Sequence, residues 1–293
     1  MAKEKLVIAG LGMLGVSLAS SLKLGRRKEE KEYEVFGYAR RREVAEKALA
    51  DGFLDGICET PEEAFRTGSI IILALPVPVI CQFIEKYASF MGEDAVLTDI
   101  GSVKGLMEES AKKVRANFVG SHPMAGTELS GPEAFVPGIY ENASVFIVPP
   151  EQAQERDIAR VEKLWKAVGG TVLRIDAKAH DSLVAHTSHV PHIISSALAL
   201  SVLDEEDASL KEYRFAGAAS GFRDTIRVAA SSPRMWREIL SSNRAAVLEA
   251  LEDYEKRYEK MKEMIRNNDF DAFEKEFARG GDLIREWRKA KKC

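Results

Sequence analysis

The sequence predicts an α/β fold in which a doubly wound, mostly parallel β-sheet is followed by an all-helical region. Short apolar runs typical of buried parallel strands alternate with helical patterns as far as Ile175. The strand patterns then stop, and long amphipathic helical patterns fill the rest of the 293 residues. This length is ample for two domains. We therefore expect one domain at residues 1–175 and a second at residues 176–293.

The first strand and helix carry a glycine pattern. The stretch Lys5–Gly15 reads KLVIAGLGMLG, an apolar run with Gly10, Gly12 and Gly15 in G-x-G-x-x-G spacing, and it opens the helix pattern Met13–Leu24. In a Rossmann domain such glycines allow a tight turn, the approach of a pyrophosphate and close helix packing. An ordinary glycine-rich turn is the alternative. We expect a dinucleotide cofactor to contact the whole turn, namely Gly10, Leu11, Gly12, Met13, Leu14 and Gly15.

A second strand pattern, Tyr33–Ala39, bears on which dinucleotide binds. An Asp or Glu at the end of this strand binds the ribose of NAD, whereas a nearby Arg accommodates the 2′-phosphate of NADP. No acid occurs here before Glu43. The residues at this position are instead Tyr38, Arg40, Arg41 and Arg42. A guanidinium suits a phosphate, although a solvated helix start is the alternative. We expect NADP to be preferred, with NAD as the other candidate.

Strand and helix patterns then alternate along the chain. They predict helices at Glu43–Ala50, Val79–Phe90 and Ile158–Val168, and strands at Ser69–Leu75, Ala95–Ile100, Asn117–Gly120, Ser144–Val148 and Thr171–Ile175. Ligands of doubly wound sheets bind at the carboxyl ends of the strands. We therefore expect the residues at these ends to line one crevice: Gly10, Pro76, Gly101 and His122. We also expect Leu75 and Pro76 to contact the cofactor.

The second region predicts helices only. Their expected ranges are Ala177–Leu203, Ser209–Ala230, Pro233–Asn267 and Asp269–Lys292. In the third of them apolar side chains recur at helical spacing from Trp236 to Tyr254, which indicates a buried face. Long amphipathic helices often bury such a face against a second copy of the chain. We therefore expect a homodimer.

Two residues at strand ends are candidates for catalysis. His122 lies in the turn sequence SHPMAG, where a histidine can act as a general base near neutral pH. Its alternative role is to bind backbone groups of the turn. Ser102 follows a strand in a Gly-Ser turn and can bind substrate or nicotinamide. Its alternative role is to cap the helix that begins near Val103.

Four histidines cluster in the second region: His180, His186, His189 and His192. Regular helical geometry places His189 about 60° from His186 and His192 about 120° from it. There is no H-E-x-x-H pattern and no cysteine partner, so we expect no metal. We expect these histidines to face the crevice and bind an acidic substrate. Pro191 should kink or begin a helix.

An arginine pair follows in GFRDTIR, where Arg223 and Arg227 lie four residues apart and Asp224 can orient Arg227. Such a pair suits recognition of a carboxylate. A surface ion pair is the alternative.

Composition narrows the class of protein. The net charge is -4 with no basic field, so we expect neither nucleic acid nor membrane as a partner. No apolar run approaches the ~20 residues of a membrane span, and the N-terminus enters a strand at once, without a signal peptide. Cys58, Cys81 and Cys293 form no metal or disulfide pattern. These features predict a cytoplasmic protein.

Five motifs in order resemble the prephenate/arogenate dehydrogenase family: GLGMLG, DIGSVK, GSHPMAGTE, HDSLVAHTSHVPH and GFRDTIR. The resemblance covers almost the whole chain. It implies oxidative decarboxylation of prephenate to 4-hydroxyphenylpyruvate, or of arogenate to tyrosine, in tyrosine biosynthesis. It also implies a dimer formed through the helical domain.

The resemblance implies a role for individual residues. His122 takes the substrate's hydroxyl proton as hydride leaves the same carbon, Ser102 orients that hydroxyl and Arg227 holds a carboxylate. Further substrate contacts are expected at His180, His189, His192, Thr127, Glu128, Asp224 and Arg223, and a subunit contact at Trp236.

The chain departs from the commonest family pattern after Gly37 and Tyr38, where many members carry an Asp and this chain has Ala39 and Arg40. Since no regulatory domain is expected, inhibition by tyrosine would act at the active site. Prephenate is the favoured substrate, with arogenate or dual use as alternatives. The rival classes are a β-hydroxyacid or imine reductase, and a dinucleotide-sensing protein without chemistry.

Overall fold

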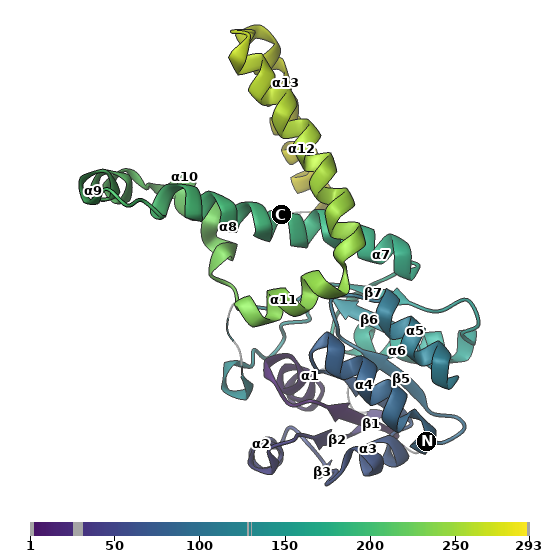
Figure 1. Cartoon of the computed structure of the whole chain (residues 1–293). Helices are drawn as coiled ribbons and strands as arrows, with labels where there is room; N and C mark the ends of the chain where they lie inside the picture. The colour runs from purple at the N-terminus through teal and green to yellow at the C-terminus, as the bar shows by residue number, and fades with distance from the viewer. Residues whose placement is uncertain (1–2, 26–31, 128, 130, 292–293) are drawn as a thin grey trace. The chain divides into compact units, whose positions relative to one another are not determined.

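A five-stranded parallel sheet lies in the N-terminal part of the computed structural model, which describes residues 3–25, 32–127, 129 and 131–291 (Figure 1). Its strands are β1 (Glu4–Ala9), β2 (Tyr33–Tyr38), β3 (Gly56–Ile57), β4 (Ile70–Leu73) and β5 (Val96–Asp99), in the order β3-β2-β1-β4-β5. All neighbouring pairs are parallel. The predicted doubly wound parallel sheet is thereby confirmed.

Both faces of this sheet are covered, which explains why the central strands β1, from Leu6 onward, and β4 are continuous apolar runs. Leu6 and Ile8 of β1 belong to the core on one face, together with Trp165. Val7 of β1 belongs to the core on the other face, together with Phe65.

Six α-helices accompany the strands: α1 (Met13–Leu24), α2 (Arg42–Ala50), α3 (Pro61–Thr67), α4 (Val77–Tyr87), α5 (Gly105–Val114) and α6 (Glu155–Ala167). Helix α1 has the predicted bounds. Helices α3 and α5 were not predicted. A start signal marks α3, since the Thr60 side chain accepts the Glu63 N–H and Pro61 stands in the first turn.

A second sheet continues from the first. It comprises β6 (Gly120–Pro123), β7 (Ser144–Val148) and β8 (Thr171–Arg174), with β6 antiparallel to β7 and β7 parallel to β8. One parallel bridge, between Leu97 and Phe118, joins it to β5. The strand predicted at Asn117–Gly120 is therefore only a bridge, and β6 begins where that prediction ends. Pairing is interrupted because the Asp99 carboxylate, rather than a strand carbonyl, accepts the Ser121 N–H.

The following residues are helical as predicted, but more finely divided. They form α7 (Ala177–Val184), the π-helical turn η4 (Ala185–His189), α8 (Val190–Leu203), α9 (Ala208–Gly217), α10 (Ser220–Ile226), the 3₁₀ turn η5 (Arg227–Ala230) and α11 (Pro233–Ser242). In η4 the Val190 N–H bonds the Ala185 carbonyl, and α8 begins beside Pro191 as predicted.

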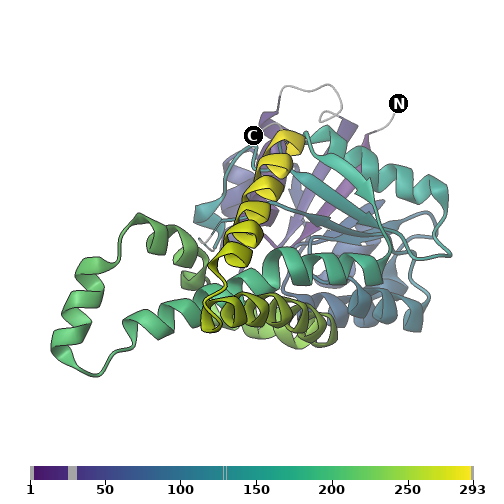
Figure 2. The same cartoon turned by 90° about the horizontal axis from the view of Figure 1, so that it is seen from above.

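Two of the predicted helices are interrupted. The helix predicted at Ser209–Ala230 breaks after Gly217, a residue type that favours helix ends. The helix predicted at Pro233–Asn267 breaks at Asn243, whose φ of -124° is not helical. Helices α10 and η5 pack against α8, and α11 packs against α4. Figure 2 shows α8 leading into α9, which α10 follows.

The chain divides into two compact units, the first ending at Arg244 and the second beginning at Ala245. The second unit consists of α12 (Arg244–Arg266) and α13 (Phe270–Lys291). These helices are joined by an ion pair between Lys260 and Glu276, at 3.1 Å. Large apolar side chains are exposed along both: Tyr254, Tyr258, Ile265, Phe270, Phe277, Leu283, Ile284 and Trp287. Within the described ranges no helix is both long and apolar enough to cross a membrane.

Candidate active site

The turn between β1 and α1 is built to receive phosphates. Gly10 has a φ of +111°, and a Cβ there would lie 2.3 Å from the Ala74 carbonyl oxygen. A Cβ on Gly15 would lie 2.0 Å from the Gly10 carbonyl oxygen, so α1 packs directly on the turn. Gly12, by contrast, has open space where a Cβ would stand, and no side chain caps the N-terminus of α1. The free N–H groups and the open cradle therefore fit a dinucleotide pyrophosphate.

Other residues predicted to bind the cofactor surround this turn. The Gly10 N–H donates to the Tyr38 carbonyl at 2.9 Å, which joins the ends of β1 and β2. Leu75 lies over Gly10, and Pro76 is exposed at the start of α4. Leu11 and Met13 of this turn are buried in the protein.

The three arginines after β2 are not equivalent. The Arg42 guanidinium is bonded to Glu46 at 2.7 Å and also pairs with Glu59. Arg40 and Arg41 are exposed and form no ion pair with any residue that the structure describes. Only Arg40 and Arg41 are thus free to meet a phosphate.

His122 lies near the end of β6 at the carboxyl edge of the sheet. Its Nδ1 is 2.9 Å from Nε2 of His180, a residue of α7 with no exposed surface. His180 Nδ1 is in turn 2.8 Å from Oδ1 of Asp181. Burial, with smaller contributions from His180 and Lys104, holds the pKa of His122 well below its usual value. His122 is therefore an uncharged imidazole at neutral pH, as a general base must be.

Asp181 also caps the helix that follows Ser102. Its two carboxylate oxygens accept the N–H groups of Lys104 and Gly105, at 2.8 and 2.9 Å. Helix α5 begins at Gly105, and no side chain of its own first turn caps it. The alternative role of Ser102 as a helix cap is therefore wrong, and its half-buried side chain is left for other contacts.

A buried ion pair fixes the strand ends that carry Ser102 and His122. Lys104 is 1% exposed and Asp99 is 0% exposed, and they are bonded to each other. Lys104 Nζ also donates to the Ser121 carbonyl at 2.8 Å, while Asp99 accepts the N–H groups of Gly101 and Ser121. This clamp joins the residue before His122 to the turn before Ser102.

His189 and His192 surround Trp236, which α11 contributes. The Trp236 ring stacks on His192 with a centroid distance of 4.0 Å and meets His189 edge-on at 5.7 Å. Burial lowers the pKa of His189 to about 4. The indole Nε1 of Trp236 is buried and has no hydrogen-bond partner among the described residues. A buried donor of this kind offers a hydrogen bond to a ligand oxygen.

Asn243 ties this group to the rest of the site. Its side-chain amide donates to the Asp181 carbonyl at 2.8 Å and lies 3.3 Å from His189 Nδ1. Local patterns missed Asn243, Asp181 and Lys104. A buried polar residue on the apolar stripe of the third predicted helix was the available signal for Asn243.

The arginine pair differs from its predicted arrangement. Helix α10 ends at Ile226, so Arg223 and Arg227 do not share one helical face. Asp224 lies 3.7 Å from Arg223, its sequence neighbour, and does not orient Arg227. Arg227 is exposed and close enough to His192 to lower the pKa of that residue further, after the larger effect of burial. Arg227 is therefore the arginine beside the histidines.

The remaining predicted substrate contacts lie in the segment after β6. Thr127 is exposed, and its hydroxyl accepts the Leu129 N–H at 3.2 Å. Glu128 lies outside the described residues. His186 is exposed on the π-helical turn.

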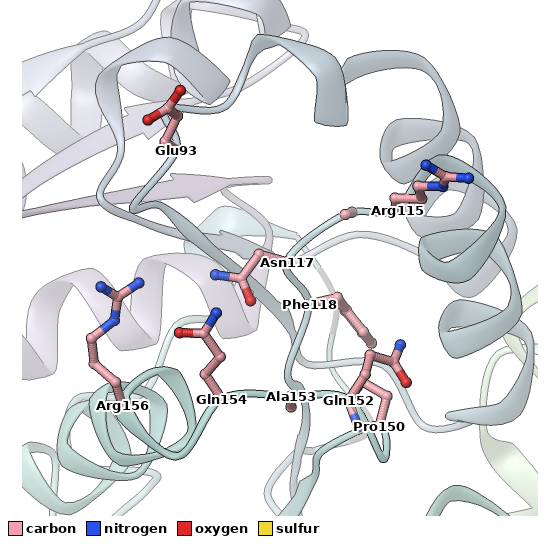
Figure 3. Close-up of a pocket in the computed structure, with 10 residues that line it drawn as sticks. Glu93, Arg115, Asn117, Phe118, Pro150, Gln152, Ala153, Gln154 and Arg156 are labelled. Atoms are coloured by element: carbon pink, nitrogen blue, oxygen red, sulfur yellow. The ribbon is translucent and has the colours of Figure 1, made fainter.

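A pocket elsewhere on the sheet contains none of the predicted site residues (Figure 3). Asn117 and Phe118, which precede β6, line it together with Pro150, which follows β7. Because β6 and β7 are antiparallel, this pocket lies at the end of β6 opposite His122.

The chain is similar to known proteins of one family. The family description "Prephenate dehydrogenase, nucleotide-binding domain" matches residues 22–174, and "Prephenate dehydrogenase, dimerization domain" matches residues 176–279. The prephenate dehydrogenase of Lactococcus lactis is 34% identical over 94% of this chain and 75% of its own length.

Two solved structures are similar over nearly the whole chain. The prephenate dehydrogenase of Aquifex aeolicus in complex with hydroxyphenyl propionate and NAD+ is 28% identical, with a TM-score of 0.87 and 98% of both chains covered. The arogenate dehydrogenase of Synechocystis is 26% identical, with a TM-score of 0.85 over 97% of this chain and 99% of its own.

Proposed function

The chain belongs to the prephenate dehydrogenase family, and we propose that it oxidatively decarboxylates prephenate to 4-hydroxyphenylpyruvate, in tyrosine biosynthesis. The observation that carries this proposal is the uncharged His122, held at the carboxyl edge of the sheet beyond the glycine cradle. An acid-binding arginine, Arg227, stands beside the histidines of the same unit.

The site residues supply orientation and proton removal. A bound oxidised nicotinamide would supply the hydride acceptor. The His122 imidazole removes the proton from the substrate hydroxyl, at the carbon that gives up the hydride. The ring carboxylate leaves as carbon dioxide, its bonding electrons complete the aromatic ring, and the resulting phenolate oxygen takes the proton back from His122. Ser102 orients the hydroxyl and Arg227 binds a carboxylate. Since aromatisation drives the reaction, positioning and a base suffice.

The finer choice of cofactor is NADP. Arg40 and Arg41 support it, because both are exposed beside the end of β2 and neither is committed to a carboxylate in the described part of the chain. Arg42 contributes less than the sequence predicted, since Glu46 and Glu59 occupy its guanidinium.

The second region is proposed to form the dimer. The match to a dimerization domain and the exposed apolar side chains of α12 and α13 support a homodimer. The boundary between residues 175 and 176, and a subunit contact at Trp236, are part of the same proposal. Arogenate, or both substrates, is the second candidate, because the Synechocystis neighbour is an arogenate dehydrogenase.

Steady-state turnover with each of the four pairings of prephenate or arogenate with NAD or NADP tests these choices. We expect prephenate with NADP to give the highest kcat/KM. Faster turnover with NAD would reject the role of Arg40 and Arg41 while leaving the reaction intact. Absence of turnover with every pairing would reject the proposed reaction.

A further inference from the structure

Two backbone N–H groups and one histidine ring nitrogen lie within hydrogen-bond distance of the Asp181 carboxylate. Its carboxylate accepts the N–H groups of Lys104 and Gly105, and the third neighbour is His180 Nδ1 at 2.8 Å. A carboxylate has no proton to give, so the His180 Nδ1 must carry one. The N-terminus of α5 holds the carboxylate that fixes the position of this proton, through a bond between Gly105 and Asp181, 76 residues apart.

The proton on His180 decides the proton on His122. Burial lowers the pKa of His180, so this side chain is neutral and carries a single ring proton, on Nδ1. Its Nε2 is then a bare acceptor, 2.9 Å from His122 Nδ1. A hydrogen bond at this distance requires the proton of the neutral His122 to be on Nδ1. The Nε2 of His122 is consequently the unprotonated nitrogen.

We propose that Asp181 is a positioning residue that, acting through His180, holds His122 in the tautomer whose bare Nε2 can accept the substrate proton. The inference rests on the proposed function, in which His122 is the base. His180 is then not a substrate contact, since it is fully buried and both of its nitrogens are engaged within the protein. After proton transfer, the charged His122 keeps Nδ1–H as the donor to His180.

The same contacts align the two catalytic side chains. Asp181 accepts the backbone N–H groups two and three residues after Ser102, while His180, its neighbour in α7, is hydrogen-bonded to His122. Asn243 holds the Asp181 carbonyl in place. Loss of the Asp181 carboxylate should therefore lower kcat while leaving cofactor affinity unchanged.

Asp176 provides a matched control. Its carboxylate caps its own helix, α7, by accepting the Ala179 N–H at 2.9 Å, and its only bond to a histidine among the described residues is from its backbone carbonyl to the His180 N–H. Asp181→Ala and Asp176→Ala each remove one capping carboxylate, that of Asp181 at the start of α5 and that of Asp176 at the start of α7. Only the first removes the acceptor of His180.

The test combines kinetics with ¹⁵N NMR of the histidine rings, with His122→Asn assigning the His122 signals. We expect Asp181→Ala to lower kcat by about 10- to 100-fold, with the KM for prephenate and the Kd for the dinucleotide changed less than about 3-fold. The wild-type His122 should be protonated at Nδ1, and this signal should be lost or mixed in the variant. Asp176→Ala should match the wild type in both measurements.

Two outcomes overturn the inference: Asp181→Ala with a wild-type kcat, or wild-type His122 protonated at Nε2. If Asp181→Ala fails to fold, the wild-type spectrum alone decides. Wild-type turnover in His122→Asn would instead reject His122 as the base, and with it the proposed function on which the inference rests.

Discussion

The proposed cofactor side and the proposed substrate side of the candidate site use different kinds of chemical group. On the cofactor side the contacts come from backbone: Gly10, Gly12 and Gly15 shape a cradle whose donors are the N–H groups of α1. On the substrate side they come from side chains: the Lys104 side chain bonds Asp99 in the core, and the Asp181 carboxylate accepts the Lys104 backbone N–H. The cofactor side needs space and free amides, whereas the substrate side depends on bonds between buried polar groups, with the Trp236 Nε1 left unpaired among the described residues.

This difference teaches where each side is vulnerable. A backbone cradle tolerates change at the exposed residues around it, because its donors do not depend on side chains. A buried polar network does not, since removing one member leaves its partner unpaired in a medium of low dielectric.

The buried pair of Lys104 and Asp99 should give the largest effect. Replacing Lys104 by Met leaves the carboxylate of Asp99 unpaired in the core. We expect the free energy of unfolding, measured with guanidinium, to fall by about 3–5 kcal/mol. The double variant Lys104→Met with Asp99→Asn removes both charges and should recover most of that loss. Equal stability of the single and double variants would show that the pair is not coupled.

Acid should weaken the substrate side next. His189 is 1% exposed, and its pKa is about 4 in the folded protein, against about 6.5 when unfolded. The unfolded chain therefore binds more protons between these values, and stability rises with pH across this window. His189 should account for about 3 kcal/mol of stability, present above pH 6.5 and lost as the pH falls toward 4.

Guanidinium unfolding at a series of pH values, in the wild type and in His189→Gln, measures this contribution. The variant should lose less stability on acidification. Part of the remaining dependence belongs to His122, His180 and His192, whose pKa values burial also lowers. An unchanged pH dependence in the variant would contradict the assignment to His189.

The exposed arginines of the cofactor side should give the smallest effect. Arg40→Ser should lower kcat/KM with NADP by about tenfold, through loss of a charged phosphate contact. Activity with NAD should be unaffected. Arg42→Ser is the matched control, because Glu46 and Glu59 already engage that side chain. Equal losses with NAD and NADP in Arg40→Ser would show that Arg40 does not read the 2′-phosphate.

The same contrast explains what sequence reasoning could and could not find. The glycine turn, the bounds of α1 and the position of His122 follow from local pattern, since strand, turn and helix are contiguous. The bond from Lys104 to Asp181 joins residues 77 apart, and no periodicity records such a pairing. Lys104 stood inside the DIGSVK motif, and Asp181 stood directly after His180. Neither could be assigned a partner before the fold brought α5 and α7 together.

The π-helical turn Ala185–His189 changes the relative directions of the four clustered histidines. It accommodates one residue more than a regular helical turn, so the angles deduced from 100° per residue do not hold across it. His180 and His192 owe their relative direction to that extra residue. Deleting Thr187, an exposed residue outside the site's contacts, would restore a regular helix and rotate one group of histidines away from the other. The directions of the histidines in the site therefore depend on the backbone geometry of this helix, and not on any one side chain.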